Sequence, residues 1–204
     1  FVSGFADIIW SLSYSSYLKS DLETQQKTAI MPFPHQQSLS NPPTNKDIEA
    51  AFVGTSRDYN FLRSLWIFAM EEAQIDYELY LTDSVKKPGR LCLSDEEYAA
   101  FLGRIRTCIQ FSARTPEIKI LCGRVWESLY ARCMLLEEEN IETKQLLIPY
   151  KHYLTFNSIQ ELAVAVECMK KHPEDRDAIA AAGSQWITET LSPEKIWAYM
   201  LVRH

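Results

Sequence analysis

Three short polar segments follow apolar runs and carry the residue types that bind anions or hydroxyl groups. The first is Gly54-Thr55-Ser56-Arg57, directly after the apolar run 50–53. Glycine lets another group approach the backbone closely, and a helix beginning after the segment would offer unpaired N–H groups. With the charge of Arg57 added, the segment fits a phosphate cradle. It equally fits an ordinary turn from a strand into a helix.

The second segment, residues 112–123, brings cations close to one carboxylate. The cations are Arg114, Lys119 and Arg124, and the carboxylate is Glu127. Such cations can hold a diphosphate, and a carboxylate can accept hydrogen bonds from ribose hydroxyls. Arg124 and Glu127 are also three residues apart, the spacing of a common ion pair on a solvated helix face. The residues alone leave both interpretations open.

The third segment is acidic and follows the apolar residues 134–136. It reads Glu137-Glu138-Glu139-Asn140-Ile141-Glu142. A run of carboxylates is most often a hydrated loop, because each charge is costly to remove from water. The alternative is that one carboxylate, or Asn140, faces a sugar.

The sequence lacks convincing motifs for metal binding, dinucleotide or P-loop nucleotide binding, and α/β-hydrolase activity. Asp175-Arg176-Asp177 has the letters of a metal-binding Asp-x-Asp motif, but it follows Pro173 inside a predicted helix, where residues two apart point to different sides. The six glycines lack the spacing of a dinucleotide fingerprint or a P-loop, and there is no Gly-x-Ser-x-Gly elbow. We therefore expect no metal and no cofactor.

The elements that must position these segments alternate between strand and helix. Apolar runs predict strands at 50–53, 77–81, 107–111, 134–136 and 153–156. Helices between them are indicated by apolar residues at helical spacing and by the capping pairs Ser94/Glu97 and Ser158/Glu161. This order predicts an α/β fold, a parallel sheet with helices on both faces. In such sheets, ligands bind at the carboxyl ends of the strands.

The 204-residue chain divides at a polar, proline-bearing stretch, residues 38–46. We expect residues 1–45 to be the end of a preceding lobe and a linker, and residues 46–204 to form the main domain. The chain begins at Phe1 in an apolar run. This beginning predicts a fragment of a longer protein, with any targeting signal upstream.

Composition narrows the class of protein. The net charge is −6 and the basic residues are scattered, which disfavours a nucleic-acid binder. With 47% hydrophobic residues and no stretch of ~18 apolar residues, the chain is expected to be globular, without a transmembrane segment, and cytoplasmic. Five cysteines far apart in sequence predict buried, reduced thiols.

The segment Gly123-Arg124-Val125-Trp126-Glu127-Ser128-Leu129, with Leu135-Leu136-Glu137-Glu138 after it, resembles the C-terminal lobe of GT-B glycosyltransferases. The similar group is the glycosyl transferases group 1-like family, which includes spore-maturation-type proteins. The resemblance covers roughly Glu49 to Met200 and rests on further matches in the same order: Phe52-Val53-Gly54, Ser158, Glu161-Leu162 and His172-Pro173-Glu174.

The resemblance implies a Rossmann-like lobe that binds a nucleotide-sugar, in a glycosyltransferase of glycan biosynthesis. We expect this enzyme to be metal-independent, because the sequence shows no convincing cluster of oxygen ligands and Arg or Lys can neutralise the leaving phosphate. Glu127 would hold the ribose, Arg124 and Arg114 would lie near the phosphates, and the loop at Gly54 would approach the diphosphate. The expected donor-binding set is Gly54, Thr55, Arg57, Arg114, Gly123, Arg124 and Glu127. The acceptor, a glycan, lipid or protein, and any catalytic base would belong to the N-terminal lobe, and the catalytic residues stay unknown.

Two departures from the family pattern support an alternative. Relatives usually carry glycine after the glutamate helix, where this chain has Arg132, which would restrict the pocket or add a charge to it. Relatives with a second donor-binding glutamate have it near Lys119, which is not acidic. The alternative is a non-catalytic GT-B-like lobe that serves as an interaction or structural module.

Overall fold

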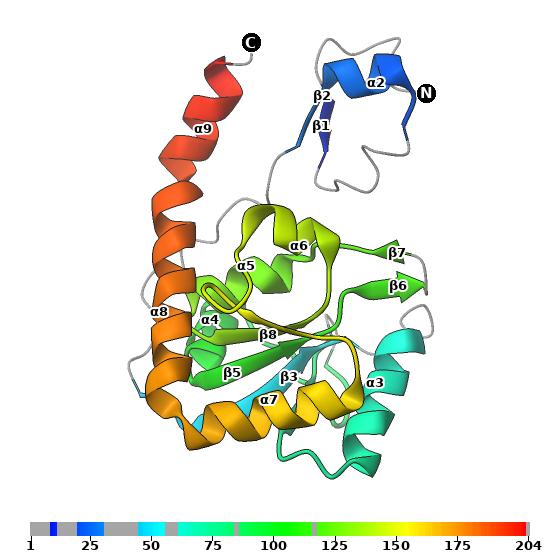
Figure 1. Cartoon of the computed structure of the whole chain (residues 1–204), viewed down its shortest axis with the longest axis vertical. Helices are drawn as coiled ribbons and strands as arrows, with labels where there is room; N and C mark the ends of the chain where they lie inside the picture. The colour runs from blue at the N-terminus through cyan, green and yellow to red at the C-terminus, as the bar shows by residue number, and fades with distance from the viewer. Residues whose placement is uncertain are drawn as a thin grey trace.

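A five-stranded parallel sheet forms the centre of the protein. The computed structural model describes residues 9–11, 20–30, 45–55, 61–83, 86–115 and 118–202. The strand order is β4-β3-β5-β8-β9, with all neighbours parallel. Figure 1 labels the three central strands of the sheet, β3, β5 and β8. The strands are β3 (Ile48–Gly54), β4 (Glu78–Leu81), β5 (Ile105–Gln110), β8 (Met134–Glu138) and β9 (Leu154–Phe156). The predicted α/β class and all five predicted strands are confirmed.

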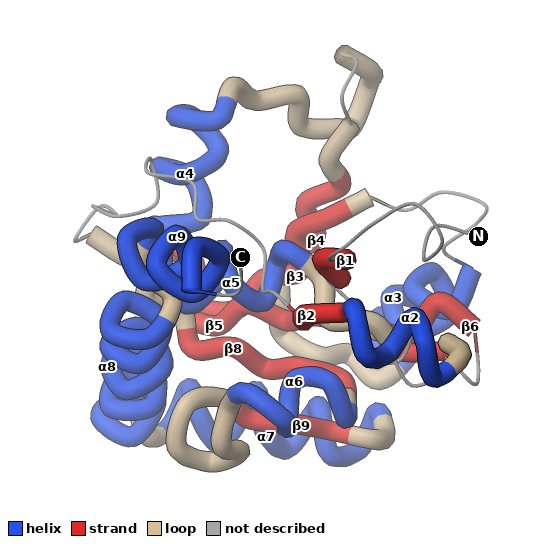
Figure 2. The backbone as a smooth tube through the Cα atoms, turned by 90° about the horizontal axis from the view of Figure 1, so that it is seen from above, coloured by secondary structure: helices blue, strands red, loops and turns tan. Residues whose placement is uncertain are grey.

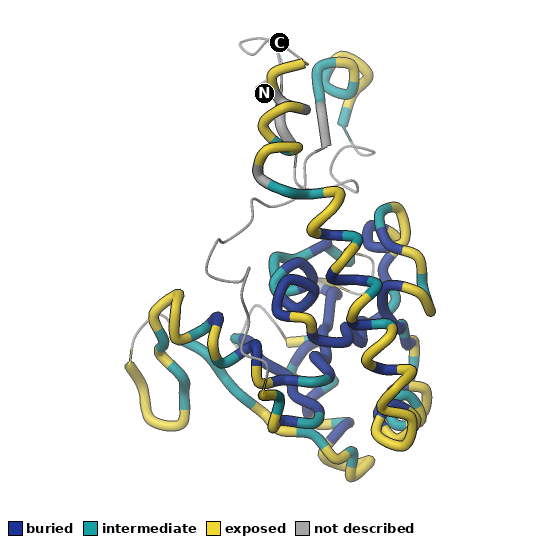
Figure 3. Tube along the Cα trace, turned by 90° about the vertical axis from the view of Figure 1, so that its left-hand side faces the viewer, coloured by how far each residue is buried: buried dark blue, intermediate teal, exposed yellow. Residues whose placement is uncertain are grey.

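Alternate residues of the central strands enter two separate cores. Ala51, Val53 and Leu135 lie in one buried cluster, while Phe52 and Leu136 lie in the other. Both faces are apolar because a parallel sheet is covered by helices on both sides. Figure 3 shows this burial concentrated around the sheet.

Helices lie on both faces of the sheet (Figure 2). The first core packs against α4 (Asp95–Gly103), α5 (Gly123–Tyr130) and α6 (Ile141–Leu146), and the second against α3 (Phe61–Glu72) and α7 (Ile159–Lys171). Helix α8 (Pro173–Thr190) contributes Ile187 to the first core and Ala180 to the second. The prediction of helices on both faces is therefore confirmed.

The helix starts follow the signals in the sequence. Ser94 and Glu97 form a reciprocal capping box at α4, and Ser158 caps α7. Pro173 occupies the first turn of α8, where its missing N–H costs nothing. Helix α9 (Pro193–Val202) follows α8.

A second, smaller group of elements lies beyond the sheet. Strands β1 (Ile9–Ser11) and β2 (Thr28–Ile30) pair in parallel, and α2 (Leu22–Lys27) lies between them in sequence. They occupy the same end of the molecule as α9 (Figure 1). Most of the predicted linker 38–46 lies outside the described residues, so the boundary near residue 45 stays a prediction.

Two features were not expected from the sequence. Residues after β5 form an antiparallel pair, β6 (Ala113–Thr115) and β7 (Ile118–Lys119). The cysteine prediction is wrong for Cys92 and Cys168, which are exposed, Cys168 on the outer side of α7; all five cysteines are free. Among the described helices, none is long and apolar enough to cross a membrane.

Candidate functional site

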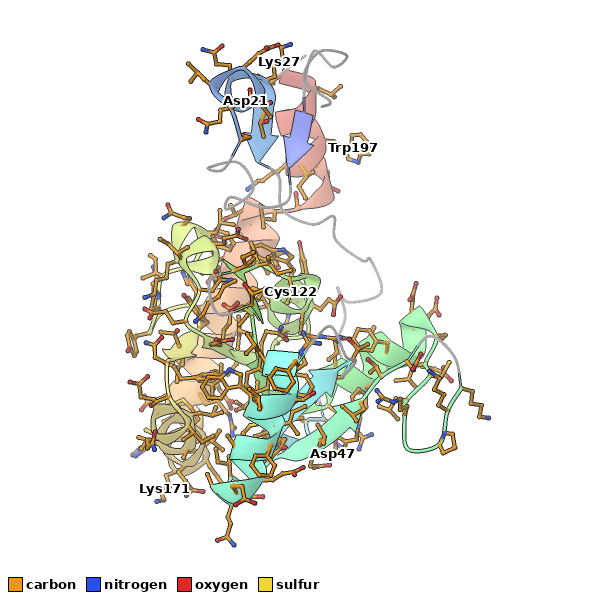
Figure 4. All side chains as sticks on the ribbon, turned by 90° about the vertical axis from the view of Figure 1, so that its right-hand side faces the viewer. Asp21, Lys27, Asp47, Cys122, Lys171 and Trp197 are labelled. Atoms are coloured by element: carbon orange, nitrogen blue, oxygen red, sulfur yellow. The ribbon has the colours of Figure 1, made fainter. Side chains whose placement is uncertain are left out.

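The carboxyl edge of the sheet gathers the polar segments singled out in the sequence. Strand β3 ends at Gly54, β5 at Gln110 and β8 at Glu138, so the segments that follow these strands leave from the same edge. Helix α5 begins here, with Cys122 as its N-cap (Figure 4). This is the edge at which open α/β sheets bind ligands.

The first turn of α5 offers hydrogen-bond donors. The first N–H groups of a helix have no acceptor within the helix, and the Cys122 side chain makes no capping hydrogen bond to them. The N–H of Val125 reaches the Cys122 carbonyl, at 3.1 Å. The N–H of Gly123 is thus suited to an anion, helped by the positive end of the helix dipole. The N–H of Arg124 also lies near the Cys122 sulfur, a weak acceptor that an anion can replace.

Cys122 itself is a neutral thiol at physiological pH. Burial, and to a smaller extent the carboxyl group of Glu137, raises its pKa to about 11. The backbone N–H groups of Arg124 and Val125 and the charge of Arg63 offset part of this rise. The thiol therefore has a packing and hydrogen-bonding role rather than a nucleophilic one.

Glu127 is held from one side only. Its Oε2 accepts a 2.8 Å hydrogen bond from the Tyr98 hydroxyl and lies 3.2 Å from Nη1 of Arg124. The Arg124 guanidinium also stacks over the Tyr98 ring, 4.9 Å from its centroid. In the described part of the chain Oε1 has no hydrogen-bond partner, and the side chain is 29% exposed. One carboxylate oxygen is thus fixed and the other is available.

Gly123 leaves room for that available oxygen. A Cβ atom at Gly123 would lie 3.4 Å from Oε1 of Glu127, at the tight end of van der Waals contact. A larger side chain would cover the oxygen. The absence of a side chain at Gly123 therefore keeps this oxygen accessible.

Arg63 connects the loop at Gly54 to the start of α5. Its Nη1 donates a 2.6 Å hydrogen bond to the Thr55 carbonyl, and its guanidinium lies over the Phe52 ring. The side chain is buried, and its charge acts on Cys122. A buried cation thus lies between the two segments that were predicted to approach a diphosphate.

The structure describes the other expected site residues only in part. Arg57 lies outside the described residues, and for Arg114 the structure describes the backbone, in β6, but not the side chain. Lys119 donates to the Glu139 carbonyl and forms an ion pair with Glu138. Gly123, Arg124 and Glu127 do lie together on α5.

The interpretation of 137–142 as a hydrated loop is wrong. Strand β8 continues through Glu138, and Glu137, Glu138 and Glu142 are all buried. Glu138 Oε2 accepts the backbone N–H groups of Ser112 and Ala113, and Glu142 Oε2 accepts that of Leu121. Backbone N–H groups from segments distant in sequence thus take the place of water around Glu138 and Glu142.

Glu137 differs from its acidic neighbours because no backbone N–H or cation pairs with it in the described structure. Burial raises its pKa to about 8, although Thr143 and Asn140 partly oppose the rise. Glu137 is therefore mostly a neutral carboxylic acid at pH 7.

Arg132 does not affect the candidate site. It follows the last turn of α5 and precedes β8, at the opposite edge of the sheet from Gly123. Its φ is 55°, and the N–H groups of Arg132 and Cys133 bond the carbonyls of Leu129 and Ser128. This is a left-handed helix terminus that usually carries glycine. The neighbouring cavity of about 350 Å³, lined by Arg132 and α8, lies at that far edge.

Two site residues were missed in the sequence, Tyr98 and Arg63. Both stand on helices, α4 and α3, and point towards residues that are distant in sequence. The signal for Arg63 was a cation among the apolar positions of its helix. Tyr98 carried no comparable signal.

No metal-binding cluster of three or more His, Cys, Asp or Glu side chains occurs in the described ranges. Asp175 and Asp177 lie within α8, as expected, and Asp177 accepts a hydrogen bond from Arg176.

The sequence from residue 65 to 201 matches the model of the family described as "Glycosyl transferase-like". No curated protein matches the sequence significantly.

Solved glycosyltransferase structures share the fold. Sucrose-phosphate synthase from Thermosynechococcus elongatus superposes with a TM-score of 0.71 at 15% identity, over 97% of this chain and 57% of that one. Anabaena Alr3699/HepE, in complex with UDP and glucose, superposes with a TM-score of 0.75 at 9% identity, over 98% of this chain and 63% of that one. A glycosyltransferase from Rickettsia africae superposes with a TM-score of 0.71 at 9% identity, over 98% of this chain and 65% of that one. The chain thus spans roughly three fifths of these structures.

Proposed function

Because the chain belongs to the glycosyl transferase-like family, we propose that it is the donor-binding lobe of a GT-B glycosyltransferase that uses a nucleotide-sugar. The parallel sheet and its helices match the lobes of GT-B enzymes. The observation that carries the proposal is the half-fixed carboxylate of Glu127, whose Oε1 is available beside the first turn of α5.

In this proposal the ribose hydroxyls donate to Oε1 of Glu127. The diphosphate lies against the N–H groups of Gly123 and Arg124. Arg63, beneath the Thr55 carbonyl, and Arg124 add positive charge on both sides. The Anabaena protein with the same fold binds UDP and glucose, which supports a uridine nucleotide as the first probe.

The reaction breaks the bond between the anomeric carbon and the diphosphate oxygen and forms one to an acceptor hydroxyl. Charge develops on the leaving diphosphate, where helix N–H groups and arginines can stabilise it without a metal ion. We propose that the acceptor, a glycan, lipid or protein, and any catalytic base are bound or supplied by an N-terminal lobe.

The test is calorimetric titration of the chain with UDP at pH 7. A transferase lobe is expected to bind UDP in the micromolar to millimolar range, in competition with a UDP-sugar. A non-catalytic GT-B-like module is expected to bind neither. The Arg132 departure no longer favours that module, because Arg132 lies at the other edge of the sheet.

A further inference from the structure

A buried polar cluster lies directly under the start of α5. Glu137, Asn140, Thr143 and Tyr153 are buried, and both Glu137 oxygens, Asn140 Nδ2, Thr143 Oγ1 and Tyr153 Oη have no hydrogen-bond partner of normal geometry in the described structure. Thr155, opposite Glu137 on β9, adds one more such atom, Oγ1. Unsatisfied buried groups are costly, and this many in one place indicates a function.

The cluster connects to α5 by a first route through Gln110. Gln110 and Glu137 are cross-strand neighbours on β5 and β8, and both are buried. The Gln110 amide donates to Sγ of Cys122, at 2.9 Å, and Cys122 is the N-cap of α5 (Figure 4). A shift of the Glu137 side chain can thus displace Gln110 and, through it, Cys122 at the start of α5.

A second route runs through α6. Asn140 faces Glu137, and its Oδ1 caps α6 by accepting the N–H of Glu142, at 3.0 Å. Glu142 in turn accepts the N–H of Leu121, at 2.8 Å. Both routes therefore end within residues 121–122, immediately before the donors of Gly123 and Arg124.

A neutral carboxylic acid suits this cluster better than a carboxylate. Its carbonyl oxygen can accept from the Asn140 amide and the Thr143 hydroxyl, while its own O–H can donate to another unsatisfied oxygen of the cluster. A carboxylate has no proton to donate and needs a nearby cation. Lys119, the cation that acts on Glu137, is paired with Glu138.

We propose that Glu137, in its neutral form, is a positioning residue of the donor site, and that it holds Gln110, Asn140 and through them the first turn of α5 in the arrangement that binds the nucleotide. The inference rests on the proposed function. Ionisation places an unpaired charge in the cluster, which is relieved when Asn140 and Gln110 shift and admit water, and the anion-binding turn is then displaced.

The titratable groups that face Glu137 come from four elements. Glu138 is next to it on β8, Lys119 lies on β7, Cys122 caps α5, and Tyr153 precedes β9. Burial raises the pKa of Cys122 to about 11 and raises that of Tyr153 as well, so neither ionises below pH 9. Within this cluster, a change between pH 7 and 9 thus belongs to Glu137.

The experiment is UDP titration at pH 7, 8 and 9 for the wild type, Glu137→Gln and the matched control Glu138→Gln. With a Glu137 pKa of about 8, wild-type affinity is expected to fall about tenfold from pH 7 to 9. Glu137→Gln, a permanently neutral side chain, is expected to show only the weaker trend of the nucleotide's own titration. Glu138→Gln is expected to keep the fall. An identical pH profile for the wild type and Glu137→Gln would overturn the proposal.

Thr143→Val adds a directional check. The Thr143 hydroxyl favours ionisation of Glu137, so its removal is expected to move the fall in affinity to higher pH, whereas a purely structural role would lower affinity equally at every pH.

If the wild type binds no UDP at any pH, the proposed function fails, and amide hydrogen exchange then tests the positioning role without a ligand. After correction for intrinsic rates, protection of residues 121–124 is expected to fall between pH 7 and 9 in the wild type and to stay constant in Glu137→Gln. Equal behaviour of the two proteins would overturn the positioning role.

Discussion

The hydroxyl group of Tyr98 on α4 donates a 2.8 Å hydrogen bond to Oε2 of Glu127 on α5, 29 residues away in sequence. This contact fixes the rotamer of the carboxylate and directs its other oxygen away from Tyr98. Since α4 and α5 lie on the same face of the sheet, the contact depends on the packed fold.

Replacing Tyr98 with Phe removes this donor and keeps the ring that stacks on Arg124. A hydrogen bond to a charged group contributes about 1.5–3 kcal/mol, and only part of this is expected in binding because Tyr98 acts on UDP through the orientation of Glu127. UDP affinity is therefore expected to fall roughly two- to tenfold. The melting temperature is expected to change by a few degrees at most. Unchanged affinity, measured by calorimetry, would show that Tyr98 does not orient Glu127 for a ligand.

Glu127→Gln is expected to weaken UDP binding more strongly than Tyr98→Phe. The amide keeps the size and one acceptor but loses the charge, and a hydrogen bond to a charged group contributes about 1.5–3 kcal/mol, or roughly ten- to a hundredfold in affinity. The exposed Glu96 of α4 gives a matched control, Glu96→Gln, which is expected to bind normally. If Glu127→Gln binds UDP normally but melts several degrees lower, Glu127 is only the structural partner of Arg124.

UDP binding is expected to survive EDTA, because arginines and helix N–H groups neutralise the diphosphate in the proposed site. The measurement is the same titration with and without chelator. Binding that disappears with EDTA and returns with Mg²⁺ or Mn²⁺ would contradict metal independence.

Arg132→Gly is expected to stabilise the protein. The left-handed conformation costs any residue with a Cβ about 1–2 kcal/mol, and glycine avoids this cost. Glycine in turn loses more conformational entropy on folding, which offsets roughly 0.5–1 kcal/mol of the gain. The net gain is about 0.5–1 kcal/mol in the free energy of unfolding, measured by urea denaturation. Arg132→Ala is the control, because alanine keeps the cost of the left-handed conformation. An equal gain in stability in Arg132→Ala would mean that the arginine side chain, and not the backbone conformation, destabilises the wild type.

The stability of the protein is expected to depend on pH through Glu137. Its pKa is about 8 in the folded protein against 4.5 ordinarily, so between these values the folded state holds a proton that the unfolded state releases. The contribution of Glu137 to the free energy of unfolding is fully present below pH 4.5. It is lost as pH rises to about 8, at roughly 1.4 kcal/mol per pH unit.

Glu137→Gln removes this dependence. It is therefore expected to gain stability relative to the wild type between pH 5 and 8, in urea denaturation at each pH. Glu138→Gln, which loses an acceptor of two backbone N–H groups, is expected to be destabilised and to keep the slope. A constant difference between the wild type and Glu137→Gln would mean that Glu137 is already ionised in the folded protein.

The sequence by itself determined the class of fold and the position of its elements. The apolar runs at 50–53 and 134–136 became β3 and β8, and Ser94 and Ser158 began the helices that they were expected to cap. These features depend on neighbours a few residues apart, which hydrophobic periodicity and capping chemistry report directly. The sequence also predicted the helix that carries Glu127, which is α5, while the role of Glu127 in donor binding stays a prediction.

Tertiary structure decided the environment of each carboxylate. Glu137 and Glu138 are adjacent and look alike in sequence, yet two backbone N–H groups from beyond β5 bond Glu138 and none bonds Glu137. Tyr98 and Arg63 lie on other helices, α4 and α3, and contact the candidate site only in the folded protein. Arg132 lies outside the site because α5 ends at the opposite edge of the sheet. Such contacts join residues far apart in the chain, and the partner, the burial and therefore the charge state of a side chain are fixed only when the elements pack.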